Sequence, residues 1–304
     1  MHISICVCSY KRPESLRRLL KGLQSLKTGG LFTCSIVVAD NDAAESAKPV
    51  ASEFAAEWLL PIVYCVEPEP NIAAVRNRAL AHAKGDWIAL IDDDEFPDQE
   101  WLITLFMICQ RHEVDGVLGP VRPRFESPPP RWLIRGRFCE RPEHPTGMVL
   151  DWRQTRTGNV LFKRAILDPE QEAFRRIFGN GGEDCDFFKR MIEKSRVFIW
   201  CNEAVVWETV PPERLNRSYF LKRALLQGQN QRHFADLPGI TKSLIALPFY
   251  LLTLPLMLLK GQHAVMKTLI KATSHFGKLA ALIGFKPMGS NYLTRPKNGL
   301  AISH

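Results

Sequence analysis

The chain has 304 residues, of which 46% are hydrophobic and 24% are charged, a composition typical of a globular protein and not of a disordered one. This length is sufficient for one large α/β core with an appendage. The formal net charge is +8, and the eight basic residues that follow Asp236, with no Asp or Glu among them, account for all of it. A neutral body with a basic tail argues against a globally basic nucleic-acid-binding protein and indicates a tail that meets an anionic surface.

The eight cysteines include no C-x-x-C pair, and most lie in apolar runs. We therefore expect reduced, buried thiols in a cytosolic compartment, and neither a zinc knuckle nor a secreted disulfide framework. The N-terminus has no basic region followed by a long apolar run. The expectation is that no signal peptide is present and that the protein acts inside the cell.

The first 120 residues alternate between short apolar runs and helical patterns. The runs predict buried strands at residues 3–7, 36–39, 63–66 and 87–91. Pro13 is expected to begin an amphipathic helix, and Asn71 is expected to cap a helix that continues to about Ala83. Alternation of buried strands with helices predicts an α/β fold with a parallel sheet. Ligands of such sheets lie beyond the carboxyl ends of the strands, where Asp40 and residues 92–94 fall.

The second half of the body has weaker signals. Residues 120–145 are rich in Pro and Arg and predict a flexible loop. Residues 158–162 predict a short strand, and residues 179–182 predict a hinge-like turn into a helix that begins near Glu183. Residues 197–200 and 204–207 are the last predicted segments of the main domain.

Three adjacent aspartates, Asp92, Asp93 and Asp94, follow the apolar run at 87–91. Their mutual repulsion favours protonation unless a cation lies among them. A hard divalent ion, Mg²⁺ or Mn²⁺, shared with substrate phosphates would explain the cluster. The alternative is an acidic surface turn, and the position of the cluster at a strand end favours the metal site.

A second acidic group, Glu183, Asp184 and Asp186, follows a pair of glycines. The helix dipole stabilises acids in a first turn, so one or two of them need no function. Three acids in four positions exceed that need. A carboxylate presented by a flexible turn can deprotonate a sugar hydroxyl.

Five motifs in order resemble the family-2 glycosyltransferases, in particular bacterial enzymes that build exopolysaccharide repeat units, of the succinoglycan glucosyltransferase type. The motifs are Cys8-Ser9-Tyr10-Lys11-Arg12-Pro13, Val37-Val38-Ala39-Asp40-Asn41, Asn71-Ile72-Ala73-Ala74-Val75-Arg76-Asn77, Ile91-Asp92-Asp93-Asp94-Glu95 and Gly182-Glu183-Asp184. The resemblance covers about residues 1–235. It implies a GT-A fold, in which a Rossmann-like, mostly parallel sheet with helices on both faces binds a nucleotide-sugar.

The resemblance also implies roles for individual residues. Ser9, Tyr10 and Arg12 would line the nucleotide-sugar pocket. Asp40 would accept a hydrogen bond from the base, commonly uracil, and Arg76 would contact the base or the diphosphate. Asp92 would approach the ribose or the metal. Asp93 would belong to the nucleotide-sugar site, and Asp94 would ligate the metal.

The implied reaction is a single displacement that inverts the anomeric carbon. Asp184 would be the general base, with Glu183 as the alternative. Many relatives carry a His after the late strand, where this chain has Glu208, so Glu208 is the candidate third metal ligand. Residues 227–233 echo the Gln-x-x-Arg-Trp motif of processive members only loosely. We therefore expect one sugar to be transferred per encounter.

The tail is expected to associate with a membrane. Residues 243–259 carry no charge but contain Pro248 and Pro255. A straight helix of this length would be about 25 Å long, short of the roughly 30 Å core of a bilayer. The alternatives are a buried core helix and a spanning helix. Residues 265–285 place three lysines among apolar residues, as in an interfacial helix. Basic flanks would keep the tail cytoplasmic.

These observations predict a glycosyltransferase domain at 1–236 and a basic, apolar, membrane-associated helical tail at 237–304. The expected reaction transfers a hexose from a nucleotide-diphosphate sugar, most simply a UDP-sugar, to a lipid-linked oligosaccharide. It would take place at the cytoplasmic face of a bacterial inner membrane, in exopolysaccharide or cell-envelope synthesis. Two alternatives are a sugar nucleotidyltransferase, which would need a Gly-rich loop after the first strand, and a non-catalytic membrane-bound scaffold, which would have no reason to keep both acidic clusters.

Overall fold

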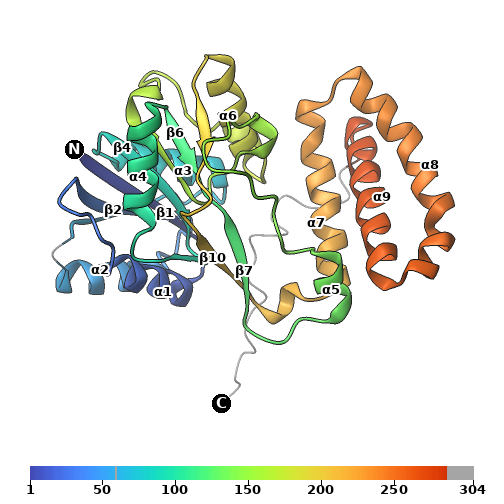
Figure 1. Cartoon of the computed structure of the whole chain (residues 1–304), viewed down its shortest axis with the longest axis horizontal. Coiled ribbons are helices and arrows are strands. Elements are labelled where there is room, and N and C mark those ends of the chain that lie inside the picture. Colours follow the sequence, from blue (N-terminus) through green and yellow to red (C-terminus); the bar gives the residue numbers. More distant parts are fainter. Residues whose placement is uncertain (59, 286–304) are drawn as a thin grey trace. The chain divides into compact units, whose positions relative to one another are not determined.

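The computed structural model describes residues 1–58 and 60–285 (Figure 1), so the part of the predicted tail at 286–304 lies outside the described residues. The chain forms two compact units. Unit 1 comprises Met1–Arg124 and Glu140–Thr209. Unit 2 comprises Phe125–Cys139 and the chain from Val210 onward. The predicted boundary at residue 236 falls inside unit 2.

A seven-stranded sheet with the order β3-β2-β1-β4-β8-β6-β9 forms the centre of unit 1. The first four strands of that order are parallel, β8 runs antiparallel to both of its neighbours, and β6 and β9 are again parallel. The strands are β1 (His2–Ser9), β2 (Thr33–Asp40), β3 (Ile62–Val66), β4 (Trp87–Asp92), β6 (Gly116–Leu118), β8 (Val160–Lys163) and β9 (Phe198–Trp200). A second sheet, of order β5-β10-β7, contains β5 (Glu95–Pro97), β7 (Val121–Phe125) and β10 (Val206–Val210).

Helices cover both faces of the large sheet (Figure 1). Alternate side chains of β1, such as Ile5 and Cys6, enter opposite cores. One core receives α1 (Pro13–Leu23), α2 (Lys48–Glu57) and α4 (Trp101–His112). The other receives α3 (Ile72–His82) and α6 (Glu183–Glu193). Short 3₁₀ turns lie at Trp152–Gln154, Arg164–Ile166, Arg176–Phe178, Pro212–Arg214 and Gln231–Phe234.

The strongest local signals are confirmed. Pro13 is the first residue of α1, and Asn71 caps α3 by accepting hydrogen bonds from the amides of Ala73 and Ala74, both at 3.0 Å. The four predicted strands correspond to β1 to β4, and α6 begins at Glu183. The mostly parallel α/β sheet with helices on both faces is therefore as predicted.

The prediction of a flexible loop at 120–145 is wrong for part of that segment. Residues Val121–Phe125 form β7, and residues Arg131–Gly136 form α5. β7 is an edge strand, because the order of its sheet is β5-β10-β7. Pro123 is tolerated there, since an edge strand has one side without ladder hydrogen bonds. Leu133 of α5 is buried with Phe220 and Met266 in the core of unit 2.

Unit 2 combines α5 with α7 (Arg217–Asn230), α8 (Leu237–Lys260) and α9 (Gln262–Leu282). α9 packs against both α7 and α8 (Figure 1). A Cβ atom on Gly228 would lie 2.0 Å from the Ser274 carbonyl oxygen, and one on Gly277 would lie 2.4 Å from that of Leu225. These glycines therefore permit the close approach of α7 and α9. The helix predicted at 265–285 corresponds to α9, which buries Met266 and Ala272, and its contact with a membrane stays a prediction.

α8 is longer than the uncharged run predicted. It has 24 residues, with Pro248 and Pro255 inside it, and at about 1.5 Å per residue its length is about 36 Å. Ser243 is the one buried residue of this helix, which excludes the alternative of a buried core helix within the described chain. Of the described helices, α8 alone is long and apolar enough to cross a bilayer, judged by length and composition.

Candidate active site

The three aspartates after β4 lie close to arginines from two helical segments. Arg12, which precedes α1, donates to Asp93 Oδ1 at 3.2 Å and to Asp94 Oδ2 at 3.0 Å. The Ser9 hydroxyl donates to Asp93 Oδ2 at 2.8 Å. Arg76 of α3 lies 3.4 Å from Asp92 Oδ1. The end of β1, the end of β4 and helix α3 therefore bring these predicted residues together.

Burial changes the protonation of this cluster. Burial raises the pKa of Asp93 to about 7, and the neighbouring Asp94 adds to this effect while Arg12 opposes it. Burial also raises the pKa of Glu95 well above its usual value. Glu95 Oε2 accepts the Asp92 amide at 3.0 Å and therefore fixes the turn that carries the aspartates. Gly158 packs against this carboxyl group, since a Cβ there would lie 2.6 Å from Glu95 Oε1.

Glu208 approaches the cluster from β10, where it lies opposite Glu95 in the antiparallel ladder. Arg141 donates to Glu208 Oε2 at 2.5 Å. Glu208, Glu95 and the β4 aspartates together raise the pKa of Arg141 despite its burial. Glu208 therefore lies beside the acidic cluster, in the region where the third ligand was expected.

Arg141 and Arg156 are two arginines at this site that no sequence motif marked. The Arg156 guanidinium lies 5.9 Å from the centre of the Trp200 ring. Burial and the charge of Arg141 lower the pKa of Arg156 to about 10, whereas Glu95, Asp184 and Glu208 oppose the shift. The side chain therefore stays cationic at neutral pH beside the acidic cluster. Arg141 lies in the arginine-rich segment 120–145, whereas Arg156 lies outside it and belongs to none of the five motifs.

The acids of α6 have different environments. Glu183 is buried and forms an ion pair with Arg76. Asp186 is buried and is paired with Arg175 and Arg190. Asp184 is partly exposed, and its Oδ1 accepts the adjacent Cys185 amide at 2.8 Å. Asp184 is therefore the least buried of these three acids.

Asp40 lies at the end of β2 with a fully buried side chain. Its carboxylate accepts the Asp42 amide at 3.0 Å, the Ala47 amide at 2.7 Å and the Tyr64 hydroxyl at 3.0 Å. It therefore orders the loop after β2, and its contact with a nucleotide base stays a prediction. Tyr10 is partly exposed at the end of β1, with the Lys11 ammonium 5.3 Å from its ring.

The donor set suits a hard divalent cation, because Asp92, Asp94 and Glu208 offer carboxylate oxygens. Each of these carboxylates is paired with an arginine: Arg76, Arg12 and Arg141, respectively. Within residues 1–58 and 60–285, no group of three or more His, Cys, Asp or Glu side chains converges on one point. Ligation would therefore require these side chains to move toward one another.

Comparison with known proteins gives a consistent result. Residues 4–176 match the family model described as Glycosyl transferase family 2. The succinoglycan biosynthesis protein ExoM of Rhizobium meliloti (strain 1021) is 34% identical over 233 residues, which cover 75% of this chain and 74% of ExoM. The hyaluronan synthase of Pasteurella multocida is 25% identical over 251 residues, 71% of this chain and 25% of the synthase.

Solved structures share the fold at low sequence identity. S. aureus TarS 1–349 in complex with UDP aligns with a TM-score of 0.54 and 14% identity, covering 93% of this chain and 92% of TarS 1–349. The mannosyltransferase PcManGT from Pyrobaculum calidifontis, in complex with GDP-Man and Mn²⁺, aligns with a TM-score of 0.58 and 16% identity, covering 96% of this chain and 77% of PcManGT.

Proposed function

The chain belongs to glycosyltransferase family 2 and has a GT-A fold, and from this premise we propose that it transfers a hexose from a UDP-sugar to a lipid-linked oligosaccharide, with inversion. The observation that carries the proposal is the difference in burial and ion pairing among the three acids of α6. Glu183 and Asp186 are buried in ion pairs, whereas Asp184 is partly exposed. Similarity to ExoM supports a role in exopolysaccharide synthesis.

In the proposed reaction Asp184 accepts the proton of the acceptor hydroxyl. The hydroxyl oxygen forms a bond to the anomeric carbon of the donor while the bond from that carbon to the diphosphate oxygen breaks. The nucleoside diphosphate leaves with the electron pair. One displacement inverts the anomeric carbon and needs no covalent intermediate. The pairing of Glu183 with Arg76 supports Asp184 over Glu183 as the base.

The leaving diphosphate needs positive charge near it. Arg76 of α3 and Arg12, just before α1, supply this charge, and Arg156 adds a cation beside Asp184. Asp92, Asp94 and Glu208 would hold Mg²⁺ or Mn²⁺, which when bound neutralises charge on the two phosphates. The presence of Mn²⁺ in the PcManGT complex supports this assignment.

The proposed location is the cytoplasmic face of a bacterial membrane. Exposed apolar side chains along α8 support attachment through that helix, among them Leu244, Phe249, Leu252 and Leu259. Lys242 near its start and Lys260 at its end would meet anionic headgroups. Such a location would bring the enzyme to a polyprenyl-diphosphate-linked acceptor.

The donor half of the proposal is tested by calorimetric titration of the full chain with UDP, with and without Mn²⁺. We expect binding that requires Mn²⁺ and that is lost in Asp94→Ala. Asp98→Ala is a matched control, because Asp98 is an exposed acid four residues further along the same turn region. Absence of binding of UDP, GDP and dTDP under both conditions would overturn the proposal.

The role of Asp184 is tested by the rate at which UDP is released from UDP-glucose in the presence of membranes that contain lipid-linked oligosaccharide. Removal of a general base lowers such rates by about 10²–10⁴-fold, so we expect that loss in Asp184→Asn. Glu193→Gln, a change of the same kind at an exposed acid of α6, should keep the full rate. Full activity of Asp184→Asn would remove this residue from the mechanism.

A further inference from the structure

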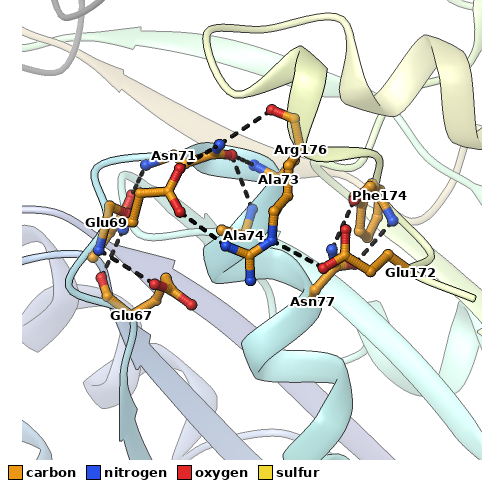
Figure 2. Close-up of polar contacts among 10 residues, drawn as sticks. Glu67, Glu69, Asn71, Ala73, Ala74, Asn77, Glu172, Phe174 and Arg176 are labelled. Carbon is orange, nitrogen blue, oxygen red and sulfur yellow. Dashed lines mark hydrogen bonds and ion pairs between the residues drawn. The ribbon is translucent and has the colours of Figure 1, made fainter.

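The segment that leads into α6 lies along one side of α3 (Figure 2). Asn77 of α3 exchanges two hydrogen bonds with the backbone of Phe174: its Nδ2 donates to the carbonyl oxygen at 2.7 Å, and its Oδ1 accepts the amide at 2.9 Å. At the start of the same helix, the Ile72 amide donates to the Gly179 carbonyl at 3.1 Å. α3 therefore holds this segment at two points before it reaches Asp184.

Asn71 is where three connections meet (Figure 2). Its Oδ1 caps the first turn of α3. Its Nδ2 donates to the Arg176 carbonyl and to Glu69 Oε1, both at 3.1 Å. Its backbone amide donates to Asn41 Oδ1 at 3.1 Å, in the loop that follows Asp40. Asn71 thus joins the loop after β2 to the segment before α6.

Arg176 and Gly179 reinforce this connection. The Arg176 guanidinium lies between Glu69 and Glu172, with Nη1 2.8 Å from Glu69 Oε2 and Nε 2.9 Å from Glu172 Oε1 (Figure 2). A Cβ atom on Gly179 would lie 2.5 Å from Asn71 Cγ, so a larger residue would push the segment away. Gly179 therefore lies directly against the Asn71 side chain, with no room for a Cβ atom.

We propose that Asn71 is a positioning residue for Asp184, which it places by fixing the 174–179 segment against α3. Gly181 and Gly182 separate this anchor from Asp184, and both have a positive φ, +115° and +94°. Glycines restrain the backbone little, so the start of α6 takes its position from the anchor before them, from the ion pair of Glu183 with Arg76 and from the buried Phe187 and Phe188 of the same helix. The inference rests on the proposed function only in the role of Asp184 as base.

The test is Asn71→Asp, which separates the anchor from the helix cap. Aspartate keeps the Oδ1 acceptor and the backbone amide bonded to Asn41, but it loses both donations from Nδ2. We expect amide hydrogen exchange in peptides covering 174–184 to become at least tenfold faster, while exchange in α3 is unchanged. Asn216→Asp is the matched control. Asn216 caps α7 in the same way, and its Nδ2 also donates to a backbone carbonyl, that of Glu213.

Turnover provides the second measurement. A displacement of about 1 Å can lower a rate by about 10²-fold, so we expect kcat for UDP release to fall at least tenfold in Asn71→Asp while the Kd for UDP changes less than twofold. Unchanged exchange at 174–184 would overturn the inference, as would faster exchange with an unchanged kcat. An active Asp184→Asn protein with normal exchange would instead show that the proposed base is wrong.

Discussion

The buried pair of Arg76 and Glu183 allows a quantitative test of how the site is held together. Their side chains are 7% and 4% exposed, and Asp92, 3.4 Å from Arg76, is 44% exposed. Removal of one partner of a buried pair costs about 3–5 kcal/mol, because the other charge is left without compensation. Arg76→Met leaves Glu183 without a cation, and we expect that full loss in the free energy of unfolding.

The reverse change should be milder. In Glu183→Met the arginine keeps Asp92 as a partial partner, so the expected loss is about 2–3 kcal/mol. The double variant replaces both charges by apolar groups of similar length, a change that is often nearly neutral. The sum of the two single losses in the free energy of unfolding should therefore exceed the loss in the double variant by at least about 2 kcal/mol.

Urea unfolding followed by tryptophan fluorescence is a suitable assay, because six of the seven tryptophans lie in unit 1 and Trp132 alone lies in unit 2. The control pair is Lys189, which is partly exposed, and Glu193, which is exposed; their charged groups are 3.8 Å apart on α6. For this pair, the losses in the free energy of unfolding of the two single methionine variants should add up to that of the double variant within about 0.5 kcal/mol. Equally additive losses at Arg76 and Glu183 would refute the view that this pair is a buried, coupled unit.

Two further predictions concern the stability of unit 1. Asn159 is fully buried; it accepts from Trp101 Nε1 at 2.7 Å and donates to the carbonyls of Pro120 at 2.9 Å and Ala204 at 2.7 Å. Asn159→Leu leaves three buried groups unpaired at about 1–3 kcal/mol each, so urea denaturation should show a loss of at least about 3 kcal/mol, and a loss below about 1 kcal/mol would contradict this. Burial raises the pKa of Asp93 to about 7, above about 3.9 in an unfolded chain, so the native state binds the proton more tightly. In EDTA the free energy of unfolding should therefore fall by up to about 4 kcal/mol as the pH rises from about 4 to about 7. The fall should be smaller in Asp93→Asn. An equal dependence on pH in both proteins would contradict this prediction.

The parts of the fold that could be predicted have strong local signals. Strands β1, β2 and β4 are largely buried on both faces and appear as apolar runs, the partly buried edge strand β3 is also an apolar run, and Pro13 and Asn71 mark helix starts. β7 and α5 were missed because residues distant in the sequence stabilise them. β7 pairs with β10, and Leu133 of α5 packs against Phe220 and Met266. Composition cannot report such partners.

In the candidate site, too, residues with a local sequence pattern could be predicted and residues without one could not. The aspartates at the end of β4 and the acids at the start of α6 could be located from the sequence, since strand ends and helix starts have recognisable patterns. The sequence left Glu183 and Asp184 as alternatives. The burial of Glu183 and its pairing with Arg76 distinguish it from the partly exposed Asp184. Arg141 and Arg156 were missed because an arginine that meets an acid across the fold has no local pattern.

The division of the chain into two units has a consequence for its synthesis. Residues 125–139 interrupt unit 1 and belong with the chain from Val210 onward. The ribosome therefore releases α5 about 80 residues before α7 begins to appear, which at about 5–20 residues per second is a delay of roughly 4–16 s. During this interval Leu133 lacks Phe220 and Met266, with which it packs in the folded protein. The nascent chain thus exposes an apolar segment until α9 is made, which makes this segment a natural binding site for chaperones and the point at which C-terminal truncations should aggregate.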